Sequence, residues 1–419
     1  MPYTPEQIAM MRKKEAALPD AMRRDPNVNY YEGWFHVTLN TRDGVPVLSI
    51  CEGDINAADG TADAPRCRLT QLGKAVEKEW RNINRYYKYC ICDELQVMPE
   101  HIHALLHLLP GNKGHLGRIV NGLMIGCTHA YWDTLGIPWR EMRKQLDDVL
   151  KHNLEEAGAN IDDETRREIE VKHKALIEEH QDRLHMRSFR GPALFVRGYN
   201  DMEAITDDEV EIKRQYIRNN PRKRLIQGYR HECFQKHRNR HSRNWTLDRV
   251  MNAVAAAFSH NTEKLAMAQK AVKARLNADE RGIALDYIGN VELLSSEKKL
   301  PLVCHRADAN LFEVQKEAVI NAARNGFVIV SAFISQKERD IKQLLIAEQL
   351  PFVEIIDNGI AEKYKGVGKS FYALAERKLC QITPWKYRYE KDVKVSREMC
   401  MVMNELSRVI SGRNDDWWK

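Results

Sequence analysis

The chain has 419 residues, of which 43% are hydrophobic and 30% charged, and a formal net charge of +6. Its length exceeds the size at which one hydrophobic core keeps growing, so we expect two or three domains. The composition excludes global disorder. A membrane-spanning helix needs roughly 18 consecutive apolar residues, and the sequence has no apolar stretch of that length, which excludes a membrane-embedded protein. The nine cysteines lack the regular spacing of a disulfide framework, which favours free thiols. The N-terminus does not resemble a secretion signal, so we expect a cytoplasmic protein.

The first part of the chain, after a charged helical lead-in over residues 1–30, has the pattern of an α+β domain. Aromatic and β-branched runs predict strands, and apolar residues at helical spacing predict a helix. The expected elements are strands at 33–40 and 45–51, a helix at 69–86, and strands at 88–98 and 101–109. This order indicates an antiparallel α+β sheet.

Two further helices, a charged insertion and a short strand are expected before residue 220. They are a helix at 115–132, a charged helical insertion at 140–187, a short strand at 193–197 and a helix at 207–219. Thr206 precedes the last helix as an N-cap, and acids fill its first turn. Pro221 disfavours helical geometry at Asn220, so this helix should end there or just before it.

The pattern changes after a run of basic residues at 218–243. A helical connector over residues 246–290 is expected to separate a first domain at 31–245 from a second domain at 291–419. In the second domain, continuous apolar runs alternate with helices, which is typical of a β-α-β-α-β unit with a parallel sheet. The strands are expected at 300–304, 327–334 and 352–356, and the helices at 311–324 and 337–348.

Two histidines fall on one face of a predicted strand. Alternate side chains of a strand share a face, so His101 and His103 lie together, while Ile102, Ala104 and Leu106 face the other way. Neutral imidazole is a good ligand for a divalent metal, and a strand fixes the separation of two such ligands. The alternative is that both histidines are hydrogen bonded within the sheet and bind no metal.

A tyrosine and an amide share one face of the helix that ends near Pro221. Tyr216 and Asn220 are four residues apart, which places them one turn apart on a helix. A phenolate can attack a phosphodiester when a metal polarises the phosphate, and the resulting phosphotyrosine keeps the bond energy for rejoining. The alternative is a tyrosine that packs its ring and exposes its hydroxyl.

Four motifs in chain order resemble those of the HUH single-strand DNA transposases, in particular the REP-associated tyrosine transposases. They lie at residues 97–103, 115–122, 197–201 and 216–221, so the resemblance covers about residues 30–230. It implies a ferredoxin-like HUH domain with Tyr216 as the nucleophile, and magnesium or manganese held by His101, His103 and Asn220. It also implies cleavage and rejoining of single-stranded DNA at hairpins through a 5′-phosphotyrosine.

Two other functions fit the same motifs. A relaxase or replication initiator nicks and rejoins DNA without moving an element, and a domesticated protein binds hairpin DNA without cutting it. The single tyrosine in the motif and the retention of both histidines favour the transposase. This interpretation implies a cytoplasmic, nucleoid-associated protein that acts as a monomer or a homodimer.

The basic run provides candidate contacts to DNA. Arginine and lysine side chains neutralise phosphates and supply affinity that depends on salt. The candidate residues are Arg218, Arg222, Lys223, Arg224, Arg230, Lys236 and Arg238. The alternative is a solvated basic face.

Residues 327–335 and 364–370 of the second domain resemble the Rossmann-like domains of the DNA-processing protein A and lysine-decarboxylase-like families. Two serines end a predicted strand at the point where doubly wound sheets bind ligands. The candidate ligand pocket of this domain consists of Ser331, Ser335, Gly368 and Lys369. The alternative is a purely structural or DNA-contacting module.

Overall fold

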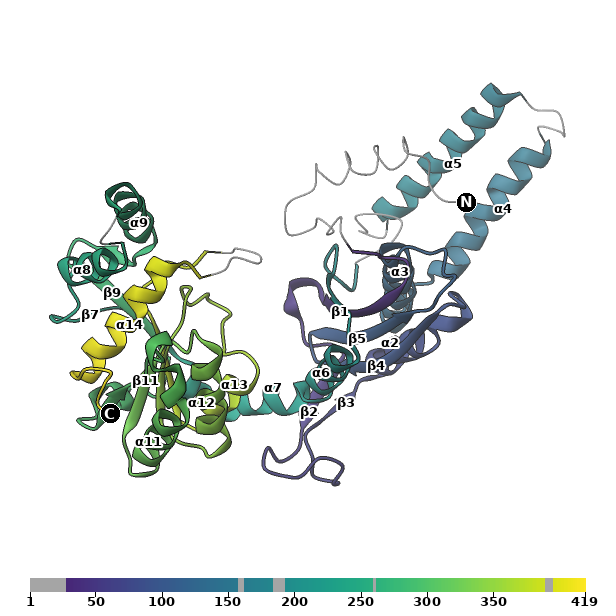
Figure 1. Cartoon of the computed structure of the whole chain (residues 1–419). Helices are drawn as coiled ribbons and strands as arrows, with labels where there is room; N and C mark the ends of the chain where they lie inside the picture. The colour runs from purple at the N-terminus through teal and green to yellow at the C-terminus, as the bar shows by residue number, and fades with distance from the viewer. Residues whose placement is uncertain (1–27, 157–161, 184–192, 259–260, 389–394) are drawn as a thin grey trace. The chain divides into compact units, whose positions relative to one another are not determined.

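The computed structural model describes residues 28–156, 162–183, 193–258, 261–388 and 395–419. The chain forms two compact units, Met1–Leu225 and Ile226–Lys419. Both units combine helices with sheets that contain antiparallel strands (Figure 1), which confirms the predicted α+β class. Within the described ranges, no helix is long and apolar enough to cross a membrane.

The first unit is built on a four-stranded antiparallel sheet with the order β4-β5-β1-β6. Its strands are β1 (Gly33–Asn40), β4 (Cys90–Val97), β5 (His101–Leu108) and β6 (Asn200–Ala204). β1, β4 and β5 confirm three predicted strands. The strand predicted at 193–197 is wrong, because that segment makes one isolated bridge, from Phe195 to Thr41, and the strand itself starts after the turn at Gly198.

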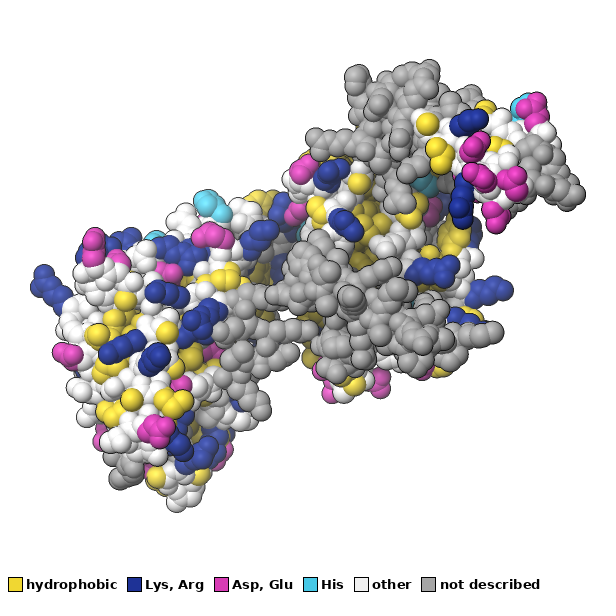
Figure 2. All heavy atoms as spheres, turned by 90° about the horizontal axis from the view of Figure 1, so that it is seen from above, with side chains coloured by type: hydrophobic (Ala, Val, Ile, Leu, Met, Phe, Trp, Pro, Cys, Tyr) yellow, Lys and Arg dark blue, Asp and Glu magenta, His cyan; other side chains and the backbone are white. Residues whose placement is uncertain are grey.

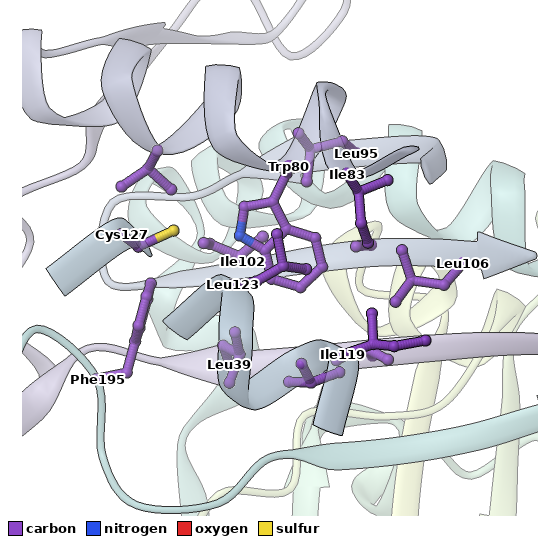
Figure 3. Packing of buried hydrophobic residues seen from close by; sticks show 14 of the residues in the cluster. Leu39, Trp80, Ile83, Leu95, Ile102, Leu106, Ile119, Leu123, Cys127 and Phe195 are labelled. Carbon is purple, nitrogen blue, oxygen red and sulfur yellow. The ribbon is translucent and has the colours of Figure 1, made fainter. Parts of the chain in front are cut away.

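Two helices and one face of this sheet enclose the core of the first unit. They are α2 (Gln71–Arg81), which begins where the Thr70 hydroxyl accepts a hydrogen bond from the Gly73 amide, and α3 (Leu116–Thr134). Side chains of one sheet face recur at every second position, so alternate residues of β1 and β5 are buried here. Figure 3 shows Trp80 of α2 packed with Ile102 of β5 and Leu123 of α3 in this cluster.

A small sheet and two charged helices complete the first unit before β6. The sheet consists of β2 (Ser49–Glu52) and β3 (Arg66–Leu69), so the strand predicted at 45–51 begins later than expected. The predicted charged insertion forms α4 (Trp139–Glu156) and α5 (Asp163–Arg183). Its last residues, 184–187, and most of the lead-in predicted at 1–30 lie outside the described residues.

The helix that carries Tyr216 has the predicted cap. In α6 (Asp207–Arg218) the Thr206 hydroxyl accepts a hydrogen bond from the Glu209 amide at 3.2 Å, and the Glu209 carboxylate accepts one from the Thr206 amide. The helix ends at Arg218, in agreement with the effect expected of Pro221. A second helix, α7 (Asn220–Tyr229), begins at once, because proline suits a first turn, where its missing N–H costs no hydrogen bond.

The second unit is built on a mixed sheet with the order β10-β11-β12-β13-β9-β7, and β8 pairs with β9. The strands are β7 (Lys236–His241), β8 (Ala278–Asp279), β9 (Gly282–Gly289), β10 (Lys299–Pro301), β11 (Val328–Ser331), β12 (Phe352–Ile355) and β13 (Leu379–Thr383). β10, β11 and β12 are parallel, as predicted, and β13, which was not predicted, continues the parallel part of the sheet. β9 then pairs with β13, and β7 with β9, in antiparallel fashion.

Helices cover both faces of this sheet (Figure 1). They are α8 (Leu247–Ala257), α9 (Thr262–Arg275), α10 (Glu292–Ser295), α11 (Phe312–Arg324), α12 (Gln336–Ala347), α13 (Lys369–Ala375) and α14 (Arg397–Ser411). α8, α9 and α14 bury the face that carries Val328 and Val330, whereas α11, α12 and α13 bury the face that carries Ile329.

The segment predicted as a connector, 246–290, instead contributes α8, α9 and β9 to this second unit. The boundary predicted at residue 245 also falls inside the unit, because β7 pairs with β9. The structural division lies at Leu225 and Ile226. Local periodicity identified the helices, but it carries no information on which sheet they cover.

Candidate active site

The face of the first sheet that carries His101 and His103 lies opposite the face covered by α2 and α3, because Ile102 faces those helices. β1 pairs with β5 so that Thr38 stands opposite His103 and His36 stands opposite Leu105. Opposed residues of an antiparallel pair share a face. His36 and Thr38 therefore join the two histidines, and sequence analysis identified neither of them.

Two ring nitrogens of the predicted metal-binding pair converge. Nε2 of His101 and Nε2 of His103 are 3.1 Å apart, and the two rings are nearly perpendicular, at 85°. Two ligands at right angles on an ion with bonds of about 2.1 Å are about 3.0 Å apart. The spacing therefore fits two neighbouring ligands of one metal ion, and it also fits a hydrogen bond between the two rings.

The second nitrogen of His103 is held by β1. Nδ1 of His103 lies 3.1 Å from Nε2 of His36 and 3.0 Å from Oγ1 of Thr38. Burial, reinforced by the nearby His101, lowers the pKa of His103, and burial lowers the pKa of His36 to about 4. Both imidazoles are therefore neutral at pH 7. A neutral imidazole whose second nitrogen is fixed by a neighbour is what a metal ligand requires.

The second nitrogen of His101 faces a carboxylate. Nδ1 of His101 lies 3.5 Å from Oε1 of Glu100, and Arg224 pairs with the same oxygen at 3.2 Å. The hydrogen bond from His101 lowers the pKa of Glu100 against the opposing effect of burial. A carboxylate behind a ligating histidine fixes the ring and raises its basicity. Arg224, a predicted DNA contact, thus lies in the ion pair behind this histidine.

α6 is docked on the histidine face by packing and by charge. Ile217 packs in a small cluster with Leu105, the residue opposite His36. Arg214 pairs with Asp93 of β4 at 2.7 Å, and both side chains are about three-quarters buried. Because these two contacts flank Tyr216 in sequence, they fix the turn of α6 that carries it.

Tyr216 contacts two of the three histidines described above, His36 and His103. Its ring centre lies 5.5 Å from the ring centres of His36 and of His103, in edge-on contact. Nζ of Lys223 lies 4.5 Å from the centre of the Tyr216 ring. Burial raises the pKa of Tyr216 and lowers that of Lys223. Tyr216 and His103, identified from separate motifs, are thus in contact, and the ammonium group of Lys223 lies over the tyrosine ring.

Asn220, the predicted third metal ligand, is turned toward the backbone at the end of α6. Its amide nitrogen donates a hydrogen bond to the Tyr216 carbonyl at 2.8 Å, and its side chain is buried. Among the described residues, no hydrogen bond joins Asn220 to either histidine, and no group of three or more His, Cys, Asp or Glu side chains is placed to hold a metal ion. A metal at this site would take two histidine ligands and leave its other positions open.

Most of the predicted DNA-contacting residues have a partner within their own unit. All five arginines are paired with acids, as Arg218 with Glu94, Arg222 with Asp59, Arg224 with Glu100, Arg230 with Glu376 and Arg238 with Asp286. Lys236 donates to the Glu362 carbonyl. Figure 2 shows that Lys and Arg side chains on the visible face of the second unit are dispersed among acidic and hydrophobic ones.

Exposure separates these arginines into two kinds. The side chain of Arg218 is 59% exposed, whereas that of Arg222 is 16% exposed. An exposed ion pair contributes little to stability, so Arg218 can exchange its carboxylate for a phosphate at small cost. Arg222 also donates to the carbonyls of Ile55 and Ala57, so it is a structural residue of the first unit.

The candidate pocket residues of the second unit serve the local backbone. Oγ of Ser331 accepts a hydrogen bond from the Phe333 amide at 3.1 Å, and Ser335 caps α12 by accepting one from the Glu338 amide at 3.2 Å. Gly368 is the N-cap of α13 with a φ of 57°, and Lys369 is the first residue of that helix. These contacts complete helix starts and a turn, so a ligand for this unit stays a prediction.

Comparison with solved structures finds a distant resemblance. A crystal structure described as that of a "putative transposase" from Deinococcus radiodurans R1 matches with a TM-score of 0.22 and 14% sequence identity. The match covers 47% of this chain and 97% of that chain. No protein-family model and no curated protein matches this sequence.

Proposed function

We propose that this chain cleaves and rejoins single-stranded DNA as an HUH-type strand transferase with Tyr216 as the nucleophile. The observation that carries the proposal is the contact of Tyr216 with the ring of His103, whose Nε2 atom lies 3.1 Å from Nε2 of His101. A phenol beside a two-histidine pair is suited to phosphodiester chemistry, in which a nucleophile attacks a phosphate. Hairpin DNA is the proposed substrate, on the strength of the sequence motifs.

His101 and His103 are the proposed ligands of a divalent ion, magnesium or manganese. A metal held there would polarise the scissile phosphate. Contacts with His36 and Thr38 orient the ring of His103, and Glu100 orients the ring of His101. Imidazole also suits softer metals, so the choice of magnesium or manganese comes from the resemblance of the motifs.

The proposed reaction of Tyr216 has two balanced steps. The phenol oxygen bonds to phosphorus as the bond from phosphorus to O3′ breaks, which leaves a 5′-phosphotyrosine, and the departing O3′ gains the proton that the phenol loses. A 3′-hydroxyl then attacks the phosphotyrosine, restores a phosphodiester and returns a proton to Tyr216. Because burial raises the pKa of Tyr216, the phenol is protonated at rest, and the nearby Lys223 favours the charge that develops on it.

The test is the formation of a covalent adduct. The full chain is incubated with a 3′-labelled hairpin oligonucleotide and manganese, and the products are separated under denaturing conditions. Tyr216→Phe removes the nucleophilic oxygen and little volume, so we expect the labelled protein band to disappear. Tyr229→Phe, at an exposed tyrosine of α7, should leave it unchanged. An adduct of wild-type yield with Tyr216→Phe would refute the proposal.

A further inference from the structure

The two cysteines of the small sheet in the first unit face each other. Cys51 of β2 stands directly opposite Cys67 of β3, and their Sγ atoms are 3.0 Å apart. Opposed residues of antiparallel strands have Cα atoms about 4.5–5.5 Å apart, and disulfides span Cα separations of about 4.4–6.8 Å. The backbone therefore already has the spacing of a disulfide. The two thiols are distant in sequence, and only the pairing of the strands brings them together.

The surroundings of the pair distinguish an attacking thiol from a resolving one. The hydrogen bond between the two thiols lowers the pKa of Cys67 against the opposing effect of burial, with a smaller contribution from a hydrogen bond with Ser49. The thiolate is the reactive form, so this difference favours Cys67 as the attacking residue and Cys51 as the resolving one. Both side chains are only partly buried, which leaves them within reach of a small oxidant.

The cysteine pair closes a loop that contacts the start of α7. Residues 53–65 connect Glu52 to Arg66, and Arg222 of α7 donates to two carbonyls of this loop and pairs with its Asp59 at 2.6 Å. On its other side the pair touches the turn that leads into β5, since Sγ of Cys67 lies 3.7 Å from Sδ of Met98. A covalent bond between Cys51 and Cys67 would join the two ends of the loop.

We propose that Cys51 and Cys67 are a redox modification site that forms a reversible intramolecular disulfide and thereby holds the loop 53–65. With oxidised glutathione as the oxidant, the Cys67 thiolate attacks one sulfur, forms a mixed disulfide and releases one glutathione thiolate. The Cys51 thiolate then attacks the sulfur of Cys67 and releases the second. Two protein thiols are oxidised to one disulfide, one oxidised glutathione is reduced to two thiols, and the two protons end on those thiols.

Mapping of the bond tests the site directly. The full chain is treated with oxidised glutathione, alkylated, digested without reductant and analysed by mass spectrometry. We expect a peptide that contains Cys51 linked to one that contains Cys67, and recovery of both as free thiols after dithiothreitol. Cys51→Ser should stop at a mixed disulfide on Cys67, and Cys304→Ser, a partly buried cysteine of the second unit, should keep the cross-link. Full alkylation of both cysteines after oxidation, or a bond to any other cysteine, overturns the proposal.

A second measurement tests the effect on the loop in the wild-type chain, so it does not depend on whether a variant folds. Closing a loop of this size is expected to raise the unfolding temperature by on the order of 5–10 °C. Amide hydrogen exchange over residues 53–65 should slow in the oxidised protein. Equal exchange in both redox forms would show that the bond does not hold the loop. Neither readout uses DNA, so the result is independent of the proposed strand transfer.

Discussion

Polar side chains gather in both units, but they face different partners. In the first unit, His36 and His103 come from different strands and face each other and Tyr216. In the second unit, Ser331 and Ser335 bond to amides two and three residues further along the chain. A side chain bonded to its own backbone completes a turn or a helix start, whereas side chains from distant segments that converge can bind a ligand. A polar residue at the end of a strand is therefore not by itself evidence for a site.

The largest effect that this contrast predicts is at His103. His103→Ala removes one of the two converging nitrogens, and we expect the rate of hairpin cleavage to fall on the order of 10³-fold, because Lewis-acid catalysis is worth several kcal/mol. Hairpin binding should change little, and chelation by EDTA should have the same effect on cleavage as the substitution. The measurement is single-turnover cleavage of a labelled hairpin.

His107 offers the matched control for this change. It lies on the same strand, where its ring stacks on Trp34 at 3.9 Å rather than meeting Tyr216. His107→Ala should keep most of the cleavage activity. Equal losses of cleavage activity in the two variants would mean that removing any histidine from β5 damages the protein. The special role of His103 would then be refuted.

The next effect concerns the loss of stability that the buried His36 of the first unit should cause in mild acid. The pKa of His36 is about 4 in the folded protein against an ordinary value of 6.5, so between these pH values the unfolded chain binds a proton that the folded chain does not. Through His36, stability therefore falls by about 2 kcal/mol as the pH drops from 7 to 5 and changes little above pH 7. His103, whose pKa burial also lowers, adds to this fall. Urea unfolding of the metal-free protein measures the pH dependence, and His36→Phe should reduce it without removing it. His231→Phe, at an exposed position of the second unit, should leave it intact.

The smallest effect is expected at Ser335. Ser335→Ala removes the N-cap of α12 and should destabilise the second unit by about 1 kcal/mol, with no change in hairpin cleavage. Denaturant unfolding monitored on the second unit gives the first quantity, and the cleavage assay gives the second. A loss of cleavage with normal stability would show that this serine faces a ligand after all.

Local geometry explains which parts of the site could be predicted from the sequence. His101 and His103 share a face because they are two residues apart on a strand, and Thr206 caps α6 because the signal lies within one turn. The contact of His36 with His103 depends on the register of β1 against β5 across 67 residues, which periodicity does not encode. The ion pairs of the arginines could not be predicted for the same reason, because their partners are distant in sequence. Arg222, for example, pairs with Asp59 in a distant loop.

The position of β5 within its sheet has a consequence for how the site opens. β5 lies between β4 and β1, so its backbone is hydrogen bonded on both edges, whereas α6 ends two residues after Tyr216. Interior strands exchange their amides only in large openings, whereas helix ends exchange in local fraying. Local opening therefore leaves the spacing of His101 and His103 intact, whereas the position of Tyr216 depends on the contacts of Ile217 with Leu105 and of Arg214 with Asp93.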